Sequence, residues 1–209
     1  MRLERPLDDI FASGTHIKVL RALSGLAPEM SVSGRDIARR AGVSHPRAIR
    51  VLASLNGQGL VTVQRLPRRD LYRLNRRHVL APELLRLIAR EPHLKFELLA
   101  MVAKELRNRA LPVTEARIFG SATRGAMTST SDIDLALVTS RKGVPVVEAA
   151  MQQISEKVYA RFGTRLNVLV GAPSLQSLAR SGQGSRSVWQ TIRREGIDVL
   201  SGVPDDAGG

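Results

Sequence analysis

The sequence predicts an α+β protein made of two modules. Apolar residues recur with helical spacing through most of the first 110 residues, whereas the remainder alternates short strand-like segments with a long helical one. Charge divides the chain at the same place, because the first 110 residues carry 21 of the 32 Lys and Arg side chains. The net charge is +13, and concentrating it in one half favours a polyanionic partner for that half.

Composition excludes several classes of protein. A chain of 209 residues that is 43% hydrophobic can bury one large core or two small ones. The absence of Cys removes disulfides and thiolate nucleophiles, and four scattered His residues do not indicate a His-rich metal site. No apolar stretch is as long as a membrane span, and the beginning, MRLERPLDD, is charged where a secretion signal is apolar. We therefore expect a cytoplasmic protein with no membrane partner.

The first 60 residues predict three helices. After Ser13, apolar residues recur with helical spacing as far as Gly25. Ser33 is placed to cap a short second helix, and Gly42 can take the left-handed conformation that closes it. Ser44 is placed to cap a third helix, whose inward face would be Ala48, Val51, Leu52 and Leu55.

The next segment predicts a β-hairpin. LVTVQRL and LYRL alternate with the period of a strand, and Pro67, Arg68, Arg69 and Asp70 between them indicate its tip. Two short helices joined at Gly-Val-Ser and followed by a hairpin resemble the winged helix-turn-helix domains of bacterial and archaeal transcription regulators. On this resemblance we expect residues 1–77 to form a winged helix-turn-helix domain.

The resemblance implies that this domain binds double-stranded DNA. The third helix would lie in the major groove and the hairpin tip at the minor groove or its phosphates. The residues that would contact DNA are Ser44, His45, Arg47, Arg50, Arg68 and Arg69. The alternative is a protein-interaction module whose arginines are only solvated.

Residues 78–111 predict a helical connector. Pro82 suits a first helical turn, and Pro92 interrupts the pattern before a second helix. That second helix carries one apolar stripe formed by Leu94, Leu98, Met101, Val102 and Leu106. The stripe would either pair two chains in a homodimer or pack on the protein's own domains.

The second half contains a more specific pattern. A strand-like segment ending at Phe119 leads into Gly120 and Ser121, and ten residues later come Asp132 and Asp134. Because side chains alternate along a strand, both carboxylates must share one face. Two carboxylates on one face repel unless a cation lies between them, which points to Mg²⁺ or Mn²⁺. Glycine lets the backbone approach a phosphate, and a serine hydroxyl can donate to one.

This spacing resembles the signature of the DNA polymerase β-like nucleotidyltransferase superfamily, in particular its minimal members. The resemblance covers residues 112–202, with 203–209 as a flexible tail, and implies a small mixed sheet flanked by helices. It also implies transfer of NMP from Mg-NTP to a protein or nucleic-acid hydroxyl, with pyrophosphate leaving. Gly120, Ser121 and Arg124 would hold the triphosphate, while Asp132 and Asp134 would be catalytic metal ligands.

The chain departs from that family at one position. The strand expected after a helix over 144–162 places Asn167 on the face of the two aspartates, where active members present a third carboxylate. An amide oxygen can bind a metal, but an amide cannot serve as a general base near neutral pH. Three interpretations stay open: an enzyme whose base comes from elsewhere, a DNA-binding regulator whose domain only binds nucleotide, and a toxin–antitoxin component with a protein partner.

Overall fold

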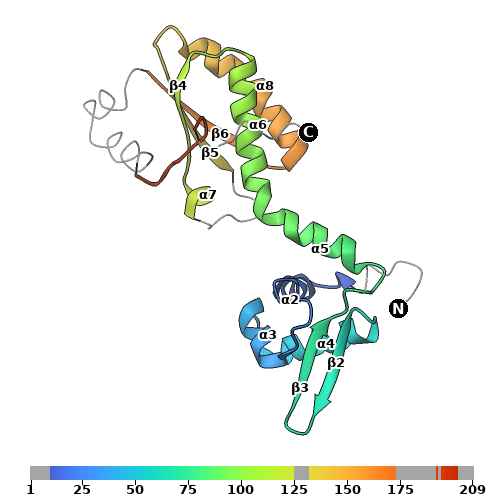
Figure 1. Ribbon diagram of the computed structural model, residues 1–209. Coiled ribbons are helices and arrows are strands. Elements are labelled where there is room, and N and C mark those ends of the chain that lie inside the picture. The colour runs from blue at the N-terminus through green and yellow to red at the C-terminus, as the bar shows by residue number, and fades with distance from the viewer. Residues whose placement is uncertain (1–9, 125–131, 173–191, 193, 202–209) are drawn as a thin grey trace. The chain divides into compact units, whose positions relative to one another are not determined.

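The computed structural model describes residues 10–124, 132–172, 192 and 194–201. The chain forms two compact units, Met1–Pro92 and His93–Gly209, each of which mixes helices with a small sheet (Figure 1). The boundary between the units falls inside the segment expected to be a connector. Among the described helices, none is long and apolar enough to cross a membrane.

The first unit contains the three helices that the sequence predicts: α2 (Gly14–Ser24), α3 (Gly34–Ala41) and α4 (His45–Gly57). The four apolar residues expected on the inward face of α4 are all buried. The Ser33 side chain accepts a hydrogen bond from the Asp36 backbone N–H, and Gly42 closes α3 with a φ of 62°. Ser44 occupies the N-cap position of α4, but its side chain makes no capping hydrogen bond.

A three-stranded sheet completes this unit, with the strand order β1-β3-β2. Strand β1 is Val32–Ser33, and β2 (Val61–Leu66) and β3 (Arg69–Leu74) form an antiparallel hairpin. Its tip is shorter than predicted, because Arg69 pairs with Leu66 and Asp70 pairs with Arg65. The ladder therefore continues to the end of β2 and leaves two residues, Pro67 and Arg68, in the turn.

The two helices expected in the connector belong to different cores. Helix α5 (Ala81–Arg90) buries Ala81 and Leu84 in the core of the first unit. After the short helix η1 (Glu91–His93), α6 (Leu94–Asn108) buries Leu98, Leu99, Val102, Ala103 and Leu106 in the core of the second. Most of the apolar stripe is thus engaged within its own unit, whereas Leu94 remains 44% exposed.

The second unit contains a mixed sheet with the strand order β6-β5-β4-β7. Its strands are β4 (Val113–Phe119), β5 (Ile133–Thr139), β6 (Leu166–Gly171) and β7 (Ile197–Asp198). Strand β4 is antiparallel to β5 and β7, whereas β5 and β6 are parallel and are joined through α8 (Val144–Phe162). This is the small mixed sheet with flanking helices that the sequence predicts.

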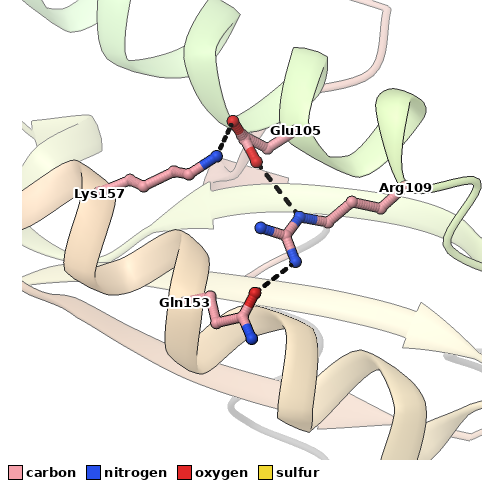
Figure 2. Close-up of polar contacts among 4 residues, drawn as sticks. All are labelled: Glu105, Arg109, Gln153 and Lys157. Carbon is pink, nitrogen blue, oxygen red and sulfur yellow. Dashed lines mark hydrogen bonds and ion pairs between the residues drawn. The ribbon is translucent and has the colours of Figure 1, made fainter.

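Helices α6 and α8 cover one face of this sheet (Figure 1). Polar contacts join the two helices at their edge: Glu105 accepts hydrogen bonds from Lys157 Nζ at 2.7 Å and from Arg109 Nε at 3.2 Å, and Arg109 also donates to Gln153 (Figure 2). The hydrogen bond from Lys157, followed by that from Arg109, lowers the pKa of the Glu105 carboxyl despite its partial desolvation.

Candidate functional site

The alternation of β5 separates its carboxylate from its aliphatic side chains. Ile133, Leu135 and Leu137 enter the core beneath α6 and α8. Asp134 lies on the opposite face and is partly exposed. Asp132 directly precedes the strand and is exposed, so the pattern of the sequence leaves both carboxylates outside the core.

The parallel pairing of β5 with β6 brings Asn167 next to Asp134. The two residues are register partners, and Asn167 Nδ2 donates a hydrogen bond to Asp134 Oδ1 at 2.9 Å. Leu166, Val168 and Val170 pack against the core, which leaves Asn167 on the face of Asp134. The structure therefore joins the two side chains at the position predicted for a third carboxylate.

The Gly120 turn lies directly against the same aspartate. Phe119, the last residue of β4, pairs with Asp134, and Gly120 follows with a φ of +75°. A Cβ at position 120 would collide with Asp134 Oδ2 and would lie 3.2 Å from Asp134 Cγ. Glycine is needed here for its left-handed backbone and for its lack of a side chain. The glycine turn and the Asp-x-Asp pattern are thus parts of one site.

Helix α7 (Ser121–Arg124) continues the turn. Thr123 Oγ1 donates to the Gly120 carbonyl at 2.9 Å, and the Ala122 side chain is buried in the core. Lys95, from α6, donates from Nζ to the Ala122 carbonyl at 3.0 Å. Sequence reasoning missed Lys95, because nothing in the local pattern of α6 relates it to a turn 27 residues away. The side chain of Arg124 lies outside the part that the structure describes.

This arrangement fits a divalent cation that is completed by ligand oxygens. Among the described residues, no group of three or more acidic or His side chains converges on one point. Asp132 and Asp134 offer carboxylate oxygens, and the amide of Asn167 also carries an oxygen. Mg²⁺ prefers oxygen ligands and is commonly held by one or two carboxylates together with substrate phosphates. The donor set is therefore suited to a metal–nucleotide complex.

A second candidate surface lies on the first unit. A cleft of about 550 Å³ separates the hairpin from the starts of α3 and α4. We call it the basic cleft; it is lined by Ser33, Gly34, Arg35, His45, Ile49, Arg68, Arg69, Asp70 and Tyr72. Three arginines and one histidine against a single aspartate give it a positive electrostatic potential.

The basic cleft gathers some of the predicted DNA contacts and not others. His45, Arg68 and Arg69 line it, whereas Arg47 and Arg50 are exposed on α4 outside it and Ser44 is exposed at the N-cap. Arg35 was missed by the sequence analysis. It follows β1, whose pairing of Ser33 with Leu71 brings the start of α3 to the hairpin.

No curated protein matches the chain. A solved structure of a toxin–antitoxin with AMP-PNP is 18% identical, covers 48% of this chain and 71% of its own, and gives a TM-score of 0.34. A mutant of the toxin–antitoxin MntA-HpeT is 16% identical, covers 47% of this chain and 68% of its own, and gives a TM-score of 0.33. Residues 99–172, which include the glycine turn, both aspartates and Asn167, match the family model of the nucleotidyltransferase domain.

Proposed function

We propose that the second unit transfers a nucleoside monophosphate from an NTP to a hydroxyl of a protein or nucleic acid. The observation that carries this proposal is the close approach of Gly120 to the Asp134 carboxylate, within a segment that matches the nucleotidyltransferase domain model. It joins a phosphate-compatible backbone turn to a carboxylate that suits a divalent cation.

Each residue then has a defined task. Gly120 lets the backbone approach the β and γ phosphates, and the Ser121 hydroxyl donates to their oxygens, with Arg124 as a further contact. Asp132 and Asp134 hold Mg²⁺ or Mn²⁺, which when bound offsets the charge on the reacting phosphate and on the leaving pyrophosphate. Phosphoryl chemistry asks the protein mainly for such positioning and electrostatic stabilisation.

Asn167 orients the Asp134 carboxylate through its amide N–H but cannot accept the proton of the attacking hydroxyl. That proton must pass to another group or to the acceptor. The same observation supports a second candidate function, in which this unit binds nucleotide without transferring it and serves a DNA-binding regulator or a toxin–antitoxin component.

A labelling experiment separates these functions. The full chain is incubated with Mg²⁺, each α-labelled NTP and either cell extract or DNA. We expect label on an acceptor with the wild type, none with Asp132→Ala, and full labelling with Asp70→Ala, an exposed aspartate of the other unit. NTP binding by calorimetry without label would favour the binding function, and new labelling by Asn167→Asp would identify the missing carboxylate as the limiting part.

We also propose that the first unit binds double-stranded DNA as a winged helix-turn-helix domain. The element order α2, β1, α3, α4, β2, β3 and the basic cleft between hairpin and helices support it. In this interpretation α4 enters the major groove and Arg68 lies at the tip of the wing. Affinity for duplex DNA should fall with salt at about 0.9 logarithmic units per neutralised phosphate, and Arg47→Ala with Arg50→Ala should weaken it. A complex insensitive to salt would contradict the proposal.

A further inference from the structure

Lys95 lies in an unusual place on α6. It is partly buried, although its apolar neighbours Leu94 and Phe96 are 44% and 61% exposed. Ordering a lysine side chain costs conformational entropy of up to roughly 2 kcal/mol, so its burial needs a compensating contact. That contact is the hydrogen bond from Lys95 Nζ to the Ala122 carbonyl at 3.0 Å, within the second unit.

Side-chain donors hold two carbonyls of the glycine turn. The Gly120 carbonyl accepts from Thr123 Oγ1, and the Ala122 carbonyl accepts from Lys95. The Ala122 side chain is buried in the core, so α7 is anchored through both its side chain and its backbone. A bare carbonyl oxygen beside a triphosphate would repel it, whereas an ammonium group on that oxygen offsets the negative partial charge.

We infer that Lys95 is a positioning residue for nucleotide binding. It ties the first turn of α6 to α7 and so holds Gly120 and Ser121 in place against Asp134, without contacting the reacting atoms. This inference rests on the proposed nucleotide-binding function of the same site. It adds a residue from outside the glycine turn and outside the strands that carry the aspartates and Asn167.

The test compares three variants of the full chain. Lys95→Met keeps the aliphatic stem and removes the charge and the donors, and Lys95→Arg restores both. Lys104→Met is the matched control, because Lys104 lies on the same helix and is exposed. Affinity for ATP, GTP, CTP and UTP with Mg²⁺ is measured by calorimetry. Hydrogen exchange of the peptide covering residues 120–124 and the melting temperature are measured without nucleotide.

We expect Lys95→Met to weaken binding of the preferred NTP about tenfold, which corresponds to about 1.4 kcal/mol. It should also speed exchange at residues 120–124. Lys95→Arg should restore most of both, and Lys104→Met should change neither. Recovery by Arg separates positioning from a general loss of stability, since an overall destabilisation would speed exchange throughout the unit.

Two results would overturn the inference. One is exchange at residues 120–124 that is no faster in Lys95→Met than in Lys104→Met. The other is equal nucleotide affinity in these two variants. If the wild type binds none of the four nucleotides, the proposed function fails, and the exchange measurement still decides whether Lys95 holds the turn.

Discussion

Replacing Gly120 by alanine tests the central contact of the candidate site. The new methyl group would meet two separate penalties. The left-handed backbone at a φ of +75° costs a non-glycine residue about 1–2 kcal/mol. The collision with the Asp134 carboxylate adds about 1–3 kcal/mol, the usual cost of an overpacked group, because Asp134 must move away from the turn.

Gly163→Ala provides the matched control. Gly163 closes α8 with a φ of +67°, but no atom lies within 4 Å of a Cβ placed there. This variant should therefore lose only the backbone contribution of about 1–2 kcal/mol. The difference between the two variants measures the close approach of Gly120 to Asp134.

Calorimetric unfolding and Mg-NTP binding are the assays. Gly120→Ala should lower the free energy of unfolding of the second unit by about 2–5 kcal/mol, and its melting temperature by roughly 10 °C or more. It should also abolish nucleotide binding, while Gly163→Ala keeps it. If both variants are equally stable and bind nucleotide equally well, the contact between the turn and the aspartate does not exist as described.

Three further predictions concern other parts of the chain. Because the pKa of Glu105 is lowered in the folded state, its ion pairs stabilise the protein above the unfolded-state pKa of about 4.5, and this contribution is lost as the pH falls through the lower folded value. Glu105→Gln should thus cost about 1 kcal/mol at pH 7 and less at pH 3 in chemical denaturation, and an unchanged cost would refute the ion pair. Ser33→Ala should destabilise the first unit by about 1 kcal/mol in the same assay, whereas Ser44→Ala, whose side chain makes no capping bond, should cost much less. Arg35→Ala should weaken DNA binding and reduce the salt slope by about 0.9, as measured by fluorescence anisotropy, while Lys18→Ala on α2 leaves the slope unchanged.

Much of the secondary structure could be predicted because its signals are local. The helix over 144–162, the left-handed closure at Gly42 and the cap at Ser33 each depend on a few neighbouring residues. The alternation around Asp134 likewise identifies which side chains leave the core. The hairpin turn was placed less well, because the charged residues Arg69 and Asp70 indicate a loop by type while the backbone ladder pairs them regardless.

By itself, the sequence determined which faces are apolar, where the positive charge concentrates, and that a glycine turn precedes two alternating aspartates by a fixed spacing. Tertiary structure alone decided that α6 joins the second core, that Asn167 donates to Asp134, and that Lys95 holds the turn. The reason is physical. Periodicity and capping act within one or two turns of chain, whereas these contacts join residues 27 to 33 positions apart and exist only once strand register and helix packing bring them together.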